Sequence, residues 1–109
     1  MGVTKTDFFT EKQNRLANLF KALAHPARIA IIQHLVKDKH CICSNLVDEL
    51  GLAQATVSQH LKELKSIGII KGSMEGTRVK YCIDKNVWKQ IRNEWDAFLG
   101  SYRSKKACA

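Results

Sequence analysis

Apolar residues recur at helical spacing through the first third of the chain. Between residues 10 and 23 they lie three or four positions apart, and Thr10 with Gln13 matches a capping box, so a helix is expected from about 10 to 23. Pro26 suits the first turn of a second helix that ends near Lys37. The apolar stripe expected on this second helix contains Ile29, Ile32, Leu35 and Val36.

Two short apolar segments joined by a glycine turn come next. The first is expected to form a helix at about 44–50, and the second places Val57, Leu61 and Leu64 on one helical face. Gly51 and Gly68 follow these segments, and a glycine just past the end of a helix commonly takes the left-handed conformation. The pattern therefore predicts two short helices, one on each side of the first glycine turn.

The period of the apolar residues changes after Gly68. Residues 78–83 alternate polar and apolar side chains as a half-buried strand does, and Glu75 with Gly76 is expected to form the turn of a hairpin. A last helix is expected from about 85 to 101, with an aromatic-rich apolar face. Two short helices that flank a turn and precede a hairpin predict a mainly α fold with a small β-hairpin wing, the winged helix-turn-helix.

The length and charge of the chain limit its organisation and its partners. A chain of 109 residues fits one domain, 1–109, with a flexible tail at 104–109. The net charge is +8, and residues 51–109 contain eleven basic and five acidic side chains. This excess favours a polyanionic partner, although charge alone fits an ordinary solvated surface equally well. Without a membrane-length apolar segment or a signal pattern, we expect a cytoplasmic protein with no membrane partner.

The face opposite the apolar stripe of the helix after Gly51 has side chains suited to reading DNA bases. Gln pairs bidentately with adenine, Ser and Thr bond either base edge, and an Ala methyl contacts a thymine methyl. A hydrated helix surface is the alternative for this face, and a solvated edge strand for the wing cations. His60, at the margin of the stripe, is expected to pack or to contact phosphate, not to bind a metal. The candidate DNA-binding residues are Gln54, Ala55, Thr56, Ser58, Gln59, Lys62, Lys71, Arg78 and Lys80.

Two segments resemble the ArsR/SmtB family of small bacterial repressors. Leu23-Ala-His-Pro-Ala-Arg28-Ile is similar to the start of that family's second helix, and residues 50–64 are similar to its recognition-helix region, within a likeness over about 12–100. Ala53 departs from the family, whose members commonly place a capping Ser there. The resemblance implies a repressor that binds operator DNA as a homodimer. Its first and last helices would form the interface between the two copies, although some apolar side chains of these helices alternatively complete the monomer's own core. The implied interface residues are Leu16, Leu19, Phe20, Trp88, Ile91, Trp95 and Phe98.

A cysteine pair resembles part of the family's metalloid site. Members that sense arsenite or antimonite have a Cys-Val-Cys-Asp-Leu-Cys run, and residues 41–46 here read Cys-Ile-Cys-Ser-Asn-Leu. The resemblance implies As(III) or Sb(III) as inducer, with Cys41 and Cys43 as ligands, because soft metalloids select thiolates. A third ligand would come from Cys108, from Cys82 or from an outside thiol, and His40 is a weaker candidate.

The family's other metal site, the zinc type, is absent from the sequence. Asp84-Lys85-Asn86 stands where an Asp-x-His is required, and Ala97 and Gly100 occupy the later ligand positions. In the absence of a secretory signal, the four cysteines read as thiols and not as a disulfide framework. Three alternatives to metalloid sensing stay open: buried thiols without a ligand, a cysteine redox switch, and a thiol enzyme that pairs Cys41 with His40. We expect no enzymatic activity and no required cofactor.

Overall fold

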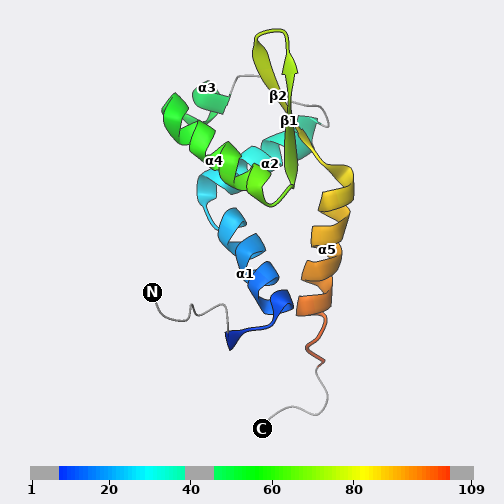
Figure 1. Ribbon diagram of the computed structural model, residues 1–109. Helices are drawn as coiled ribbons and strands as arrows, with labels where there is room; N and C mark the ends of the chain where they lie inside the picture. Colours follow the sequence, from blue (N-terminus) through cyan, green and yellow to red (C-terminus); the bar gives the residue numbers. More distant parts are fainter. Residues whose placement is uncertain (1–7, 39–45, 104–109) are drawn as a thin grey trace.

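The computed structural model describes residues 8–38 and 46–103, which form five helices and a two-stranded hairpin (Figure 1). The mainly α winged helix-turn-helix fold expected from the sequence is confirmed. Its elements are α1 (Glu11–Leu23), α2 (Pro26–Asp38), α3 (Leu46–Leu50), α4 (Gln54–Ser66), β1 (Ile70–Glu75), β2 (Arg78–Ile83) and α5 (Lys85–Leu99).

The first two helices begin with side chains that satisfy their free backbone amides. The predicted capping box of α1 is present, with the Gln13 N–H donating to Thr10 Oγ1 at 3.0 Å and the Thr10 N–H donating to Gln13 Oε1 at 3.0 Å. Helix α2 starts at Pro26, as expected, and the Ala27 N–H donates to Nδ1 of His25 at 3.0 Å. The imidazole of His25 therefore caps the second helix, a role that sequence reasoning did not assign.

Helices α3 and α4 form the helix-turn-helix around a glycine with positive φ. Gly51 has φ +65° and Gly68 has φ +79°, which confirms the left-handed conformation expected at both helix ends. Of the helix predicted at 44–50, residues 46–50 are helical, and the first two lie outside the described residues. Helix α4 begins after Ala53, whose backbone has the extended conformation of an N-cap but whose side chain makes no capping hydrogen bond.

Strands β1 and β2 pair antiparallel to form the wing, with a register that runs from Ile70 opposite Ile83 to Glu75 opposite Arg78. The turn consists of residues 76–77, one position later than predicted, because Glu75 is still paired within the ladder. Directly after β2, the carboxylate of Asp84 accepts hydrogen bonds from the second and third amides of α5 at 3.0 and 3.2 Å. This N-cap fixes the start of α5, which ends at Leu99, two residues before the predicted end.

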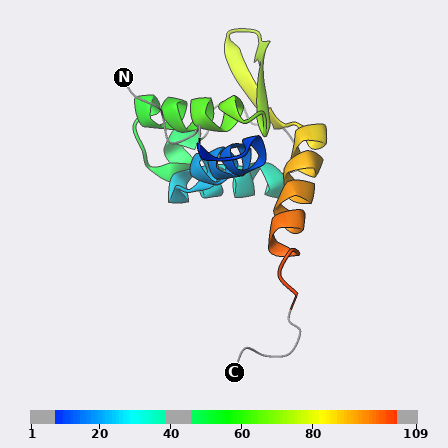
Figure 2. The same ribbon diagram turned by 60° about the horizontal axis from the view of Figure 1, so that its bottom comes forward.

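The core lies where α2, α4 and the base of the wing meet. Ile31 and Leu35 of α2 and Val57 and Leu64 of α4 are its largest fully buried side chains. Helix α5 leaves this layered body and projects away from it, as both views show (Figure 2), and it contacts α1. No helix of the described residues is long and apolar enough to cross a membrane. The fold therefore exposes two separate surfaces, the outer face of α4 with the wing, and the paired faces of α1 and α5.

Candidate nucleic-acid interface

Helix α4 has one buried apolar face and one exposed polar face, as the sequence predicted. Val57, Leu61 and Leu64 are 2%, 5% and 0% exposed, so burial of this stripe fixes the rotation of the helix about its axis. The opposite face is open to solvent over its whole length. All six α4 residues predicted to read DNA are exposed, namely Gln54, Ala55, Thr56, Ser58, Gln59 and Lys62.

Two hydrogen bonds run along the exposed face of α4. The side-chain amide of Gln54 donates to Ser58 Oγ at 3.2 Å, and that of Gln59 donates to Glu63 Oε1 at 3.1 Å. Both pairs have the i, i+4 spacing that brings helical side chains together, so this spacing was the signal that sequence reasoning missed. The bonds hold the two glutamine amides in defined orientations, and Glu63 adds a negative charge beside the proposed reading surface.

The register of the wing brings its three candidate cationic positions onto one face. Residues directly opposite each other in an antiparallel pair lie on the same face, and the pairs are Lys71 with Cys82, Ser73 with Lys80, and Glu75 with Arg78. Lys71 is exposed and Lys80 is half-buried. The other face of the wing contains the buried Ile70 and closes over the core. The cationic positions thus lie on one continuous side of the hairpin.

The buried side of α4 includes one polar residue, His60, which is 7% exposed. Arg28 donates from Nε to its Nδ1 at 3.1 Å, and the ring of His25 lies against it with centroids 4.3 Å apart. Burial, followed by the charges of His25 and Arg28, lowers the pKa of His60 below its usual 6.5. Of the two roles expected for His60, packing is confirmed, because the side chain is turned away from solvent.

The side chains predicted for the dimer interface divide into two groups. Leu19 and Ile91 are 3% and 5% exposed and belong to the core of the chain itself. Phe98, in contrast, is 50% exposed, and Trp95 is 38% exposed. Phe20 holds these two rings together, with centroid distances of 4.7 Å to Trp95 and 5.7 Å to Phe98. Leu16 and Trp88 are half-buried at the edges of this surface.

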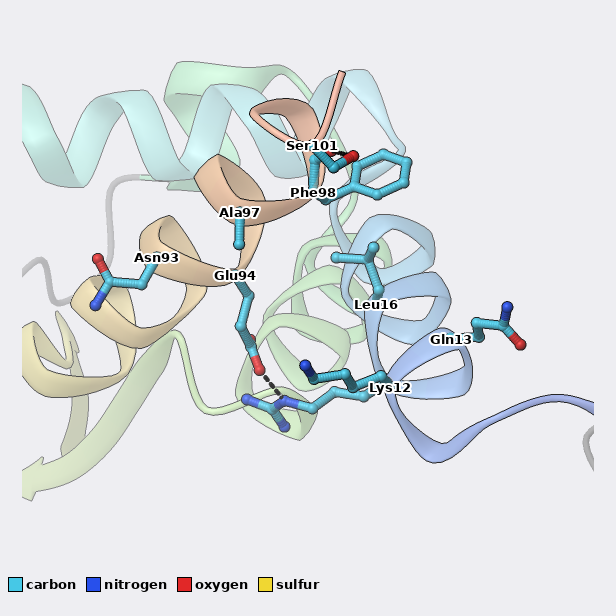
Figure 3. A pocket seen from close by; sticks show the side chains of 9 residues that line it. Lys12, Gln13, Leu16, Asn93, Glu94, Ala97, Phe98 and Ser101 are labelled. Carbon is cyan, nitrogen blue, oxygen red and sulfur yellow. Dashed lines mark hydrogen bonds and ion pairs between the residues drawn. The ribbon is translucent and has the colours of Figure 1, made fainter. Parts of the chain in front are cut away.

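Close to these rings, α1 and α5 form a mainly apolar pocket of about 570 Å³ (Figure 3). Leu16 and Phe98 line it, as do Arg15 and Glu94, which form an ion pair at 2.5 Å. This hydrogen bond and the charge of Glu94 raise the pKa of Arg15. Oε2 of Glu94 is buried without a hydrogen-bond partner among the described residues. The face shared by α1 and α5 is therefore mainly apolar and contains a pocket, and one carboxylate oxygen at this face lacks a hydrogen-bond partner among the described residues.

The predicted metalloid ligands Cys41, Cys43 and Cys108 lie outside the described residues, as does His40. Cys82 in β2 is disulfide-bonded, which corrects the expectation that all four cysteines are thiols. The residues at 8–38 and 46–103 contain no group of three His, Cys, Asp or Glu side chains placed to hold a metal.

In this chain, the second helix of a helix-turn-helix is packed on its apolar side and exposes its polar side next to a basic wing. This arrangement defines a class, the winged-helix DNA-binding proteins. The helix-turn-helix domain family matches residues 23–72, from the end of α1 to the middle of β1. An uncharacterised HTH-type transcriptional regulator of Methanocaldococcus jannaschii is 38% identical over 84 residues, which cover 75% of this chain and 93% of that one.

Two further comparisons bear on the family and on the fold. The HTH-type transcriptional repressor SmtB of Mycobacterium tuberculosis is 46% identical over 63 residues, or 58% of this chain, and the match spans about half (46%) of that relative's length. The crystal structure of the transcriptional repressor BigR from Xylella fastidiosa superposes with a TM-score of 0.61 at 24% identity, covering 94% of this chain and 100% of that one. The chain belongs to the ArsR/SmtB family of helix-turn-helix transcriptional regulators, and these relatives are regulators, not enzymes.

Proposed function

We propose that the protein is a homodimeric repressor that reads duplex DNA with the exposed face of α4. The observation that carries this proposal is the division of α4 into a fully buried stripe and an exposed row of base-reading side chains beside the wing. Gln59 and Ser58 would contact base edges in the major groove, and Lys62 would reach guanine or phosphate. Lys71, Arg78 and Lys80 would neutralise phosphates from one side of the wing.

The exposed aromatic face of α1 and α5 supports a dimer. Phe98 and Trp95 remain accessible in the monomer, and burying them against a second copy would remove apolar surface from water. A two-fold dimer of this kind places two recognition helices about 34–36 Å apart, which matches successive major grooves on one side of DNA. The proposed operator is therefore a palindrome with half-sites about one helical turn apart.

Selection of duplexes from a random pool by the wild-type protein, followed by affinity measurements, tests this reading. We expect Gln59→Ala to relax the preference at particular base pairs, because base contacts specify sequence whereas phosphate contacts position the protein. Gln90→Ala, which removes an exposed glutamine from α5, is the matched control. Equal loss of affinity for selected and random duplexes in Gln59→Ala would remove Gln59 from the reading role.

We further propose that As(III) or Sb(III), bound through Cys41 and Cys43, releases the repressor from DNA. Residues two apart on a regular helix point to nearly opposite sides, so both sulfurs face one ion only where the backbone is not helical. Metalloid binding would therefore act on the backbone just before Leu46, where α3 begins. Helix α3 contacts α4, and a coupling of about 1–3 kcal/mol already changes DNA affinity about 5- to 150-fold.

Arsenite titrations of the DNA complex, in excess reductant, test this inducer. Wild type, Cys41→Ser, Cys43→Ser and Cys108→Ser would each be bound to a selected duplex and titrated. We expect the first two variants to stay on DNA at arsenite concentrations that release the wild type. If both dissociate at the wild-type concentration, the inducer site lies elsewhere. If Cys108→Ser behaves as wild type, the C-terminal cysteine is not the third ligand.

One observation favours a second candidate, a thiol–disulfide switch. Cys82 is disulfide-bonded and lies in β2, opposite the wing cation Lys71. Making or breaking that bond would alter the wing that the proposal places on phosphate. DNA affinity measured with and without dithiothreitol, in wild type and in Cys82→Ser, distinguishes the two candidates. A redox response in wild type that Cys82→Ser abolishes, without any arsenite response, would favour the switch.

A further inference from the structure

The contact between Arg28 and His60 connects three helices through one guanidinium group. Nε of Arg28, near the start of α2, donates to Nδ1 of His60 in α4 at 3.1 Å. Its Nη1 donates to the backbone carbonyls of Lys21 at 3.3 Å and Ala22 at 3.0 Å, both in the last turn of α1. The carbonyls of a last helical turn have no partner within the helix, so a cation that donates to them stabilises the helix end. Arg28 thus fixes the end of α1 and the middle of α4 simultaneously.

His60 is placed to act as the neutral acceptor in this contact. It is the one buried polar side chain among the described residues, and it lies at the margin of the packed side of α4. An Nδ1 that accepts a hydrogen bond leaves the ring proton on Nε2, so protonation would turn the acceptor into a second donor facing Arg28. The ring of His25, 4.3 Å away, occupies another side of the imidazole.

We propose that Arg28 is a positioning residue that, through His60, holds the recognition helix at a fixed angle to α1. Neither residue would touch DNA. The apolar stripe of α4 fixes its rotation, but apolar contacts are not directional, whereas a guanidinium fork fixes direction as well as distance. Because α1 also contributes to the exposed α1–α5 face, the contact would relate the reading face of α4 to the dimer surface. This inference rests on the proposed DNA-reading role of α4.

Substitutions at both ends of the contact separate positioning from general folding. His60→Asn keeps an acceptor, since Asn Oδ1 lies the same number of bonds from Cα as Nδ1 of His, but it does not titrate. His60→Leu fills the site without an acceptor. Arg28→Lys keeps the charge but loses the fork, and Arg28→Ala removes both. Arg92→Ala, which removes an exposed arginine from α5, is the matched control.

The first measurement is affinity for a selected duplex against a random duplex, with circular dichroism to confirm folding. We expect Arg28→Ala, Arg28→Lys and His60→Leu to lose about tenfold or more of the preference, and His60→Asn and Arg92→Ala to stay within about twofold of wild type. The double variant of Arg28→Ala and His60→Leu should lose no more than Arg28→Ala alone, because Arg28→Ala already removes the contact with His60. Multiplying losses would show that the two residues act independently and would overturn the inference.

A pH series supplies a readout that a purely structural residue would not change. Between pH 7.5 and 5.5 we expect the preference of wild type to fall as His60 gains a proton, and that of His60→Asn to stay flat. His25 and Arg28 are the titratable groups that face His60, so His25→Asn, which retains a capping side chain, is included. It should show the same fall as wild type, displaced to higher pH, because the charge of His25 no longer lowers the pKa of His60. Equal pH dependence in wild type and His60→Asn would refute the acceptor role.

Hydrogen exchange without DNA distinguishes failure of this inference from failure of the proposed function. Arg28→Ala and His60→Leu should speed exchange of the α4 amides, while His60→Asn should leave it near the wild-type rate. If wild type shows no sequence preference but these rates change as expected, the DNA-reading proposal fails and the positioning contact stands. If the α4 amides exchange at the wild-type rate in Arg28→Ala, Arg28 does not hold the helix.

Discussion

Replacing Ala53 with serine should stabilise the protein, because it supplies the side-chain cap that α4 lacks. Ala53 has φ −64° and ψ 150°, the extended conformation of an N-cap residue, and its carbonyl accepts the first helical hydrogen bond from Val57 at 3.0 Å. A serine hydroxyl at this position reaches the amides of the second or third helical residue. Caps of this kind are present at α1 and α5, where Thr10 and Asp84 accept hydrogen bonds from backbone amides.

The magnitude follows from the backbone geometry already in place. No rearrangement is needed, so the gain should lie near the usual value for Ala-to-Ser exchange at an N-cap, about 1 kcal/mol within a range of about 0.5–2 kcal/mol. For a domain of this size, about 1 kcal/mol corresponds to a rise in Tm of about 4 °C. Ala55→Ser adds the same hydroxyl two residues later, inside the helix, where serine is a weaker helix former than alanine, and should lower Tm slightly.

Thermal and urea unfolding at one fixed protein concentration test this prediction, because the Tm of the proposed dimer would depend on concentration. The decisive comparison is Ala53→Ser against Ala55→Ser. If Ala53→Ser unfolds at or below the temperature of Ala55→Ser, the hydroxyl does not cap α4. The reasoning that the helix start is locally unsatisfied would then be wrong.

Three further predictions concern other parts of the molecule. DNA affinity should fall about 10³- to 10⁵-fold between 50 and 200 mM salt in fluorescence anisotropy, since about six to ten phosphate contacts per dimer displace condensed counterions, and a flat profile would contradict the basic interface. Gly68→Ala should destabilise by about 1–2 kcal/mol in urea unfolding because its φ is +79°, whereas Gly68→Asn, which tolerates this conformation, should cost less. The lowered pKa of His60 means that the unfolded chain binds more protons below about pH 6.5, so stability should fall as pH decreases from there towards the folded-state pKa, and urea unfolding should show less of this loss in His60→Asn.

The fold was predictable because local and tertiary signals agree along most of the chain. The capping box of α1, the glycines after α3 and α4, and the alternation in β2 each specify one structure. The packing uses the predicted apolar face of α4, but the face predicted for α2 was partly wrong, because Ile29 and Val36 are exposed and Ile31 is fully buried. Boundaries deviated by one or two residues where a partner strand or a cap decides them. The wing turn moved because Glu75 pairs with Arg78, which depends on register and not on turn chemistry alone.

The candidate site was predictable in its exposed part and not in its buried part. The row of exposed side chains on α4 follows from helical periodicity. The contact between Arg28 and His60 joins residues 32 positions apart, so no local pattern indicates it. Similarly, Leu19 and Ile91 have the apolar character of interface residues, but only the packing of α1 and α5 against the core shows that they are buried within one chain.

The recognition helix is stabilised from its buried side and left open at its start. Burial of Val57, Leu61 and Leu64 contributes about 1.5–3 kcal/mol for each side chain, which exceeds the roughly 1 kcal/mol that the missing cap at Ala53 costs. Packing therefore decides where the helix lies, and its first amides remain without a side-chain cap on the surface proposed to meet DNA. Backbone amides at a helix start are favourable donors to phosphate, and such contacts set the register of a protein on the duplex without reading its sequence. The start of α4 thus lacks a side-chain cap at the point where a phosphate of the proposed DNA partner would accept hydrogen bonds from its free amides. The other well-defined helix starts, at α1, α2 and α5, are capped by side chains of the protein itself.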